Sequence, residues 1–118
     1  MYWLKVNMEL NDYQKEAAKN ADYKNLDTIG GLLYTTLDLS SKSGSFVNGI
    51  KNILEKKNGK IDINDKSELI KALGELFMCV SHIADELFIT LDDVASLNLQ
   101  KLKQSQPEIL FSDETEEK

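Results

Sequence analysis

The stretch DKSELIKALGELFMCVSHIADEL, residues 65–87, decides the fold class of this chain. Its apolar residues recur at three- and four-residue steps, the spacing that places side chains on one face of an α-helix. Asp65 followed by Glu68 has capping-box spacing and predicts that the helix opens there. A face this wide is buried against other helices, so the sequence predicts an all-α fold. The members of the apolar face are Leu69, Ile70, Leu73, Leu76, Phe77, Val80, Ile83, Ala84 and Leu87.

Two further helical stretches precede this one. Asn11 and Asp12 are predicted to cap a first helix that runs through Tyr13 and Ala17 to Ala21. A second stretch begins near residues 27–28, Asp-Thr, and has one apolar face. Its members are Ile29, Leu32, Leu33 and Leu37.

The segment 40–45 contains serines and a glycine, which are poor residues for a helix interior. Two alternatives follow. Either the helix breaks there and restarts with Ser43 or Ser45 as its cap, or packing holds it continuous. The helical spacing then resumes and stops at residues 58–59, Asn-Gly, a favourable C-terminal signal. The apolar residues of this last part are Phe46, Ile50, Ile53 and Leu54.

Beyond the glycine, residues 60–64 are expected to form an ordered connection. Thr90 and Asp93 are a second capping pair and open a final helix. Its apolar residues are Leu91, Val94, Leu97 and Leu102. The sequence therefore predicts a bundle of four or five helices in one domain, residues 1–106. Residues 107–118, which begin with the single proline, are expected to be an acidic, disordered tail.

Composition excludes several classes of protein. A length of 118 residues favours a single domain, whose wide apolar faces favour association of subunits. A net charge of −6 argues against non-specific nucleic-acid binding, which needs clustered cations. Cys79 is the only cysteine, so an intramolecular disulfide cannot form and a cytoplasmic location is expected. No segment has the length of a membrane span or of a signal peptide.

Four short patterns, taken in order, point to a known family. Residues 10–14 read LNDYQ, residues 49–52 read GIKN, and residues 73–76 read LGEL. Residues 89–102 read ITLDDVASLNLQKL and are the most specific of the four. Over residues 10–103 the chain resembles the MazG-like, all-α nucleoside triphosphate pyrophosphohydrolases. The resemblance implies a helical bundle completed by a second copy, as a homodimer or a tetramer.

The resemblance also implies a reaction. Enzymes of this family cleave nucleoside triphosphates to monophosphate and pyrophosphate, with magnesium held by the acids of an E-x-x-E and an E-x-x-D pair. Acids three residues apart share a helix face, so two adjacent helices present four carboxylates to the cation. In this chain the motif positions fall on Lys42 and Ser45, and on Ala72 and Glu75. Only Glu75 is an acid, and a lysine competes with a cation for its charge, so the site is degenerate.

Other residues keep part of the family pattern. Asn98 and Lys101 match its N-x-x-K and are the candidates for nucleotide binding, together with Gln14 of the N-terminal Tyr-Gln pair. Asp38 and Glu68 lie one helical turn before lost acids. With Glu75 they are the candidate ligands of a displaced magnesium site.

The remaining candidates have simpler readings. Lys42 either forms an ion pair with Glu75, which would replace the metal by a salt bridge, or is an exposed side chain. A polar face of the strongest helix has zinc-ligand residue types but is more simply a polar helix face with one inert cysteine. Its members are Glu75, Cys79, His82 and Glu86. The cations Lys56, Lys57 and Lys60 favour a helix C-terminus rather than a phosphate site.

Three functions follow from these patterns. The first is a degenerate family member that binds a nucleotide or a protein partner without hydrolysis. The second is an active magnesium-dependent pyrophosphohydrolase with a rearranged acidic site, magnesium being required only in that case. The third is a regulatory or interaction protein that shares only the helical fold.

Overall fold

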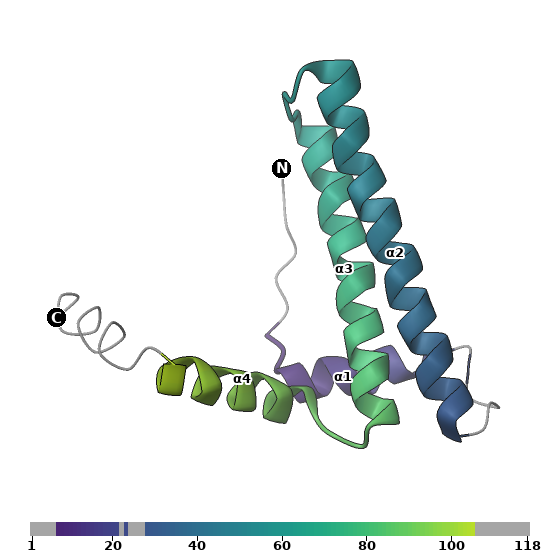
Figure 1. Ribbon diagram of the computed structural model, residues 1–118, viewed down its shortest axis with the longest axis vertical. Coiled ribbons are helices and arrows are strands. Elements are labelled where there is room, and N and C mark those ends of the chain that lie inside the picture. The colour runs from purple at the N-terminus through teal and green to yellow at the C-terminus, as the bar shows by residue number, and fades with distance from the viewer. Residues whose placement is uncertain (1–6, 22, 24–27, 106–118) are drawn as a thin grey trace, which may run out of the picture.

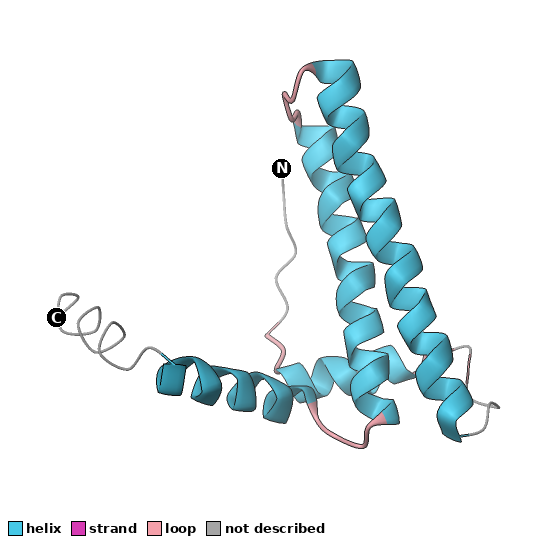
Figure 2. Ribbon diagram, viewed as in Figure 1, coloured by secondary structure: helices cyan, strands magenta, loops and turns pink. Residues whose placement is uncertain are grey.

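The computed structural model describes residues 7–21, 23 and 28–105, and between its connections this part of the chain is helical (Figure 2). The predicted all-α class is confirmed. None of the helices in these ranges combines the length and the apolar composition needed to cross a bilayer. The four helices are α1 (Leu10–Ala18), α2 (Thr28–Lys57), α3 (Ile63–Glu86) and α4 (Leu91–Ser105).

The helices are arranged in the outline of a letter L (Figure 1). The long helices α2 and α3 lie side by side and antiparallel, and together form a hairpin. The short helix α1 packs across the base of this hairpin against α3. Helix α4 leaves the base sideways and forms the second limb of the L, in contact with α1 and the end of α3.

Helix α2 is continuous through residues 40–45, so the second of the two alternatives holds. Helix α2 as a whole packs along α3, and this packing supplies the stability that the intrinsic propensity of residues 40–45 lacks. The helix ends where predicted. Asn58 has φ 54° and Gly59 has φ 81°, both left-handed, and the Gly59 N–H donates to the Ile53 carbonyl at 3.2 Å.

The start of α3 corrects the prediction. Asp62, rather than Asp65, is the N-cap, and its carboxylate accepts from the Asp65 N–H at 2.8 Å. The Asp65 carboxylate accepts in return from the Asp62 N–H at 3.2 Å, which completes a capping box. The Lys57 ammonium reaches both carboxylates, at 3.0 and 2.9 Å. This ion pairing across the turn favours the earlier cap. Lys57 lies in the last turn of α2, at the helix C-terminus that the sequence indicates, but its ion pairs with α3 were not predicted.

Helix α1 also differs from its prediction. It begins at Leu10 with Glu9 as N-cap and ends at Ala18, short of Ala21. The Asn11 side chain does not cap α1, because its oxygen accepts from the Asp92 N–H of α4 at 3.2 Å. The start of α4 agrees with the sequence, since the Thr90 hydroxyl accepts from the Asp93 N–H at 3.1 Å. The predicted start at Asp27 and the predicted tail, 107–118, lie outside the described residues.

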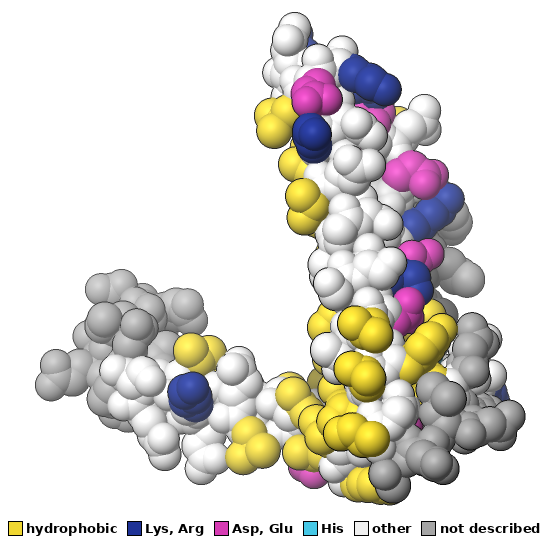
Figure 3. Space-filling model, turned by 45° about the vertical axis from the view of Figure 1, so that its right-hand side comes forward, with side chains coloured by type: hydrophobic (Ala, Val, Ile, Leu, Met, Phe, Trp, Pro, Cys, Tyr) yellow, Lys and Arg dark blue, Asp and Glu magenta, His cyan; other side chains and the backbone are white. Residues whose placement is uncertain are grey.

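The described part of the chain buries few large apolar side chains. Among its residues six apolar ones are buried, two of them alanines, whereas nineteen large apolar side chains are exposed. Figure 3 shows such side chains gathered over the lower hairpin, with others along α4. The buried residues are Ala17, Tyr23, Ile53, Cys79, Ala84 and Leu91.

Candidate functional site

A small polar hollow lies between α2 and α3, and Lys42 is the one position of the family motif that lines it. Its volume is about 60 Å³. Pockets that hold drug-sized ligands have volumes of about 300–1,000 Å³, so the hollow is far too small for a nucleotide. Its lining residues are Asn20, Tyr23, Tyr34, Thr35, Asp38, Lys42, Met78, Cys79 and His82.

In this hollow the Asp38 carboxylate contacts both Lys42 and Cys79. The Lys42 ammonium lies 3.3 Å from the Asp38 carboxylate one turn earlier. The Cys79 thiol donates to the same carboxylate at 3.5 Å. The ion pair that Lys42 forms in the described part of the chain is thus within α2, and is not the predicted pair with Glu75.

The positive charge of Lys42 and the negative charge of Asp38 stabilise each other in the hollow. Burial lowers the pKa of Lys42, but the hydrogen bond to Asp38 and the charge of that carboxylate outweigh it and raise this pKa above its usual value. Burial, then the hydrogen bond and negative charge of Asp38, raise the pKa of the Cys79 thiol. The thiol therefore remains protonated near neutral pH, and thiolate, the form that binds metals and attacks electrophiles, is disfavoured.

The inner wall of the hollow consists of His82 and Tyr23. The His82 Nε2 lies 2.8 Å from the Ala17 carbonyl, and because a carbonyl only accepts, this nitrogen carries the proton. The Tyr23 hydroxyl donates to the His82 carbonyl at 3.2 Å. Burial, with the negative charges of Asp85 and Glu86, raises the pKa of Tyr23 to about 12. His82 therefore joins the base of α3 to α1, and Tyr23 joins it to the chain that follows α1.

The three candidate magnesium ligands are not brought together within one chain. Asp38 faces Cys79, whereas Glu68 is exposed and pairs with Lys71 at 3.4 Å. Glu68 and Cys79 are eleven positions apart on α3, a rise of about 16 Å. Glu75 is exposed between them.

The lost motif positions do not form a cluster of acids either. Ser45 is exposed and Ala72 is half-buried. In the described ranges no three or more His, Cys, Asp or Glu side chains are gathered closely enough to hold a metal ion.

The side chains considered as zinc ligands on α3 contact different neighbours. Cys79 is turned to Asp38, and the His82 ring is turned to Ala17. The Glu86 carboxylate lies beside Gly31 at the start of α2, so closely that a Cβ on this glycine would meet it.

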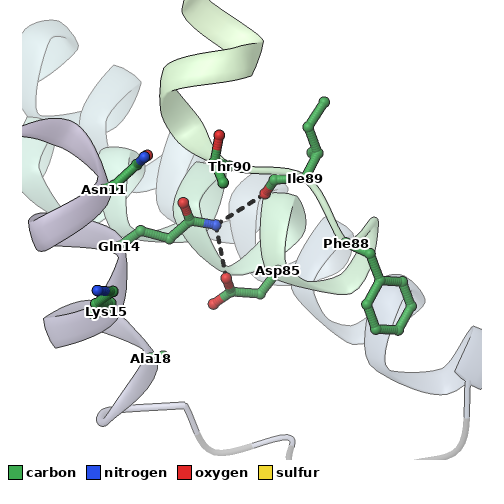
Figure 4. Close-up of a pocket in the computed structure, with 8 residues that line it drawn as sticks. All are labelled: Asn11, Gln14, Lys15, Ala18, Asp85, Phe88, Ile89 and Thr90. Atoms are coloured by element: carbon green, nitrogen blue, oxygen red, sulfur yellow. Dashed lines mark hydrogen bonds between the residues drawn. The ribbon is translucent and has the colours of Figure 1, made fainter.

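Gln14 holds three elements together at the base of the L (Figure 4). Its side-chain nitrogen donates to the Asp85 carboxylate at 2.7 Å and to the Ile89 carbonyl at 3.0 Å. Its oxygen accepts from the Leu91 N–H, the first residue of α4, at 2.8 Å. Both amide hydrogens are therefore used by the fold, and Gln14 positions α4 relative to α1 and α3.

A larger pocket opens beside Gln14, between α1 and the α3–α4 connection. Its volume is about 420 Å³, within the usual range for ligand pockets. Phe88, at one edge, has φ 58° and is 96% exposed. The lining residues, labelled in Figure 4, are Asn11, Gln14, Lys15, Ala18, Asp85, Phe88, Ile89 and Thr90.

The other nucleotide-binding candidates lie elsewhere. Asn98 lines the angle between α3 and α4, next to Phe77, Val80 and Val94. Lys101 is exposed on α4. Asn98 and Gln14 therefore line different pockets.

The sequence patterns did not predict the hydrogen bonds that join the helices at the base of the L. Gln14 and Asn11 bond to residues 71–81 positions later, and His82 bonds 65 positions earlier. Local spacing carries no signal for such pairs. The Tyr-Gln pair of residues 13–14 drew attention to this region, but as a binding element rather than a structural one.

The chain was compared with known proteins. No protein-family model matches it, and no solved structure gives a significant match. It is similar to the Gene 37 protein of Mycobacterium phage L5, with 33% identity over 99 residues, covering 81% of this chain and 87% of the phage protein. Identity at this level over most of both chains indicates common descent. The chain therefore belongs to the family of this phage Gene 37 protein.

Proposed function

We propose that this chain is a cytoplasmic, MazG-like helical protein that has lost the hydrolytic chemistry and acts by binding. In this proposal its bundle is completed by a second copy, and its partner surface is helical and apolar. The order and spacing of the four sequence patterns over residues 10–103 support the family assignment. A single cysteine, which has no partner for an intramolecular disulfide, suits a reducing compartment.

The observation that carries the loss of chemistry is the contact of Asp38 with both Lys42 and Cys79. The ammonium of Lys42 takes the place of a cation beside the carboxylate, at 3.3 Å. A magnesium ion would have to displace it and would still lack the further oxygen ligands that this ion requires. A volume of about 60 Å³ leaves no room for a triphosphate at this point.

The exposed apolar side chains support the second copy. In the described part of the chain nineteen large apolar side chains are exposed, and they supply the surface that association would cover.

The test is magnesium-dependent pyrophosphate release from nucleoside triphosphates, together with calorimetric titration of magnesium. The wild type is expected to release no pyrophosphate and to bind no magnesium. The triple variant Lys42→Glu/Ser45→Glu/Ala72→Glu restores the family acids and should bind magnesium if the helices have the family geometry. Magnesium-dependent release by the wild type that disappears in Glu68→Ala or Glu75→Ala would establish the active enzyme instead.

Binding of a nucleotide without hydrolysis is a second candidate, favoured by the pocket of about 420 Å³ beside Gln14. Lys15 offers a positive charge there, and Phe88 offers an aromatic ring. Titration of a non-hydrolysable triphosphate analogue into the wild type, Lys15→Ala and Lys101→Ala would locate the site. Binding weakened only in Lys15→Ala assigns this pocket, and binding weakened only in Lys101→Ala assigns α4.

A further inference from the structure

We propose that residues 1–6 of the chain pack on the inner angle of the L, between α3 and α4. This inference goes beyond the proposed function, because it concerns a contact within one chain and holds for a monomer and a dimer alike. We define the inner face by the apolar side chains that line this angle on the two limbs (Figure 1). They are Ile70, Leu73, Phe77 and Val80 on α3, and Leu91, Val94 and Ala95 on α4.

The inner face is a continuous apolar surface. A hollow of about 270 Å³ lies between the limbs and one of about 620 Å³ lies further up α3, and Phe77 and Val80 line both. Among the residues that line the two hollows, only Asn98 has a polar side chain. Leu73 is 55% exposed and Phe77 is 39% exposed. Apolar side chains that cover such a surface stabilise the chain, because they remove it from water.

Phe77 indicates what kind of side chain the inner face accepts. The Tyr13 ring of α1 lies 4.9 Å from the Phe77 ring, tilted by 45°, and supports it from the side of α1. The Phe77 ring also lines both hollows, so part of it is open to a further ring. Aromatic rings pack favourably in offset or tilted pairs. The inner face is therefore suited to an apolar segment that contains aromatic residues.

Residues 1–6 have this composition. They read MYWLKV, with aromatic side chains at Tyr2 and Trp3 and a single charge at Lys5. Residues 106–118, by contrast, contain five acids and follow Ser105 at the far end of α4. Burial of those acids against apolar side chains would be costly. Of these two segments, residues 1–6 are the better match to the inner face.

The position of residues 1–6 in the chain brings them to the inner face. Three residues join them to Leu10, the first residue of α1, and Leu10 itself lines the hollow between the limbs. Six residues span at most about 20 Å when extended. Ile70 and Phe77 are seven positions apart on α3, a rise of about 10 Å. The segment is therefore long enough to cover the inner face.

Covalent attachment favours this occupant over a free one. A short tether holds a segment near its binding surface at an effective concentration of the order of millimolar. A separate peptide or protein would have to reach that concentration, or bind more tightly, to occupy the inner face. Residues 1–6 therefore compete with any apolar partner that approaches between the limbs.

The test uses the fluorescence of Trp3, which is the single tryptophan of the chain. Its emission should be blue-shifted relative to a synthetic peptide of residues 1–9, and acrylamide should quench it at least about threefold less, because a packed indole is shielded from water and quencher. Ile70→Asp and Leu73→Asp place a charge on the inner face and should return both values to those of the peptide. Leu33→Asp, on α2, is the matched control, since Leu33 is 57% exposed and lines neither hollow. Circular dichroism establishes that each variant is helical.

Three outcomes would overturn the proposal. The first is wild-type emission equal to that of the peptide. The second is a blue shift that survives both inner-face variants, or that Leu33→Asp abolishes equally, because Trp3 then packs elsewhere. The third comes from mixing Leu73→Asp with an excess of Trp3→Phe, which has no tryptophan and an intact inner face. Emission that stays red supports a contact within one chain, whereas a recovered blue shift would show that the segment packs on another copy.

Discussion

Gln14 shows how one side chain can determine the relation between helices. Its amide bonds to Asp85, Ile89 and Leu91, on the end of α3, the connection and the start of α4. Gln14→Ala removes all three bonds and should lower the free energy of unfolding by about 2 kcal/mol. Lys15→Ala, the exposed neighbour, is the control and should change it by less than about 0.5 kcal/mol. Urea unfolding measures the free energy of unfolding of both variants. If the two substitutions lower it equally, the Gln14 hydrogen bonds do not contribute to stability.

Phe88 occupies a position that normally favours glycine. It follows the C-cap of α3 with φ 58°, and the N–H groups of Phe88 and Ile89 return to the carbonyls of Asp85 and Ala84. A side chain in this conformation costs about 1–2 kcal/mol. Because the ring is almost fully exposed, Phe88→Gly should be more stable than Phe88→Ala by about 1 kcal/mol. Thermal unfolding of the pair decides this, and a glycine variant that is the less stable one would contradict it.

Tyr23 predicts how stability depends on alkaline pH. Its pKa is raised to about 12 in the folded chain, first by burial and then by Asp85 and Glu86, against about 10 when unfolded. The folded state thus holds the proton more tightly. This contribution is fully present below pH 10 or so and is lost as the pH rises towards about 12. The unfolding free energy of the wild type should fall more steeply over that range than that of Tyr23→Phe. Parallel curves would contradict the raised pKa.

At the scale of elements, helical periodicity predicted the four helices but not all of their limits. The spacing of residues 65–87 gave the body of α3, and residues 58–59 gave the end of α2. The start of α3 differs from its prediction because the Asp62 and Asp65 carboxylates both pair with Lys57 across the turn. These ion pairs depend on the direction in which α2 ends. The predicted role of Asn11 was wrong because its side chain caps α4 rather than its own helix. Partners of this kind are chosen by tertiary structure, so local sequence cannot identify them.

The glycines of α2 test why this helix is continuous. A Cβ at Gly44 would meet no atom within 4 Å, so Gly44→Ala should stabilise the fold by about 0.5–1 kcal/mol through helix propensity alone. At Gly31 a Cβ would meet the Glu86 carboxylate, so Gly31→Ala should gain less or lose stability. Thermal unfolding compares the two variants. If both substitutions change the melting temperature equally, the contact of Gly31 with Glu86 on α3 does not affect the stability of α2.

At the scale of the whole molecule, the four described helices form an open L rather than a closed bundle. Composition predicted association because of the wide apolar faces, but it could not predict the L outline. That outline depends on Gln14, Asn11 and the left-handed Phe88, which fix the direction of α4. The same geometry separates Asn98 from Gln14, which motif matching had grouped together.

The central claim is that this chain is a helical binding protein whose fold is completed by a second copy. The most direct measurement is urea unfolding at about 1 µM and about 100 µM protein. Because a dimer unfolds to two chains, a hundredfold rise in concentration adds about 2.7 kcal/mol to its stability. With a denaturant slope of about 2–3 kcal/mol per molar, the midpoint should rise by about 1 M urea. A midpoint that is the same at both concentrations would contradict the claim.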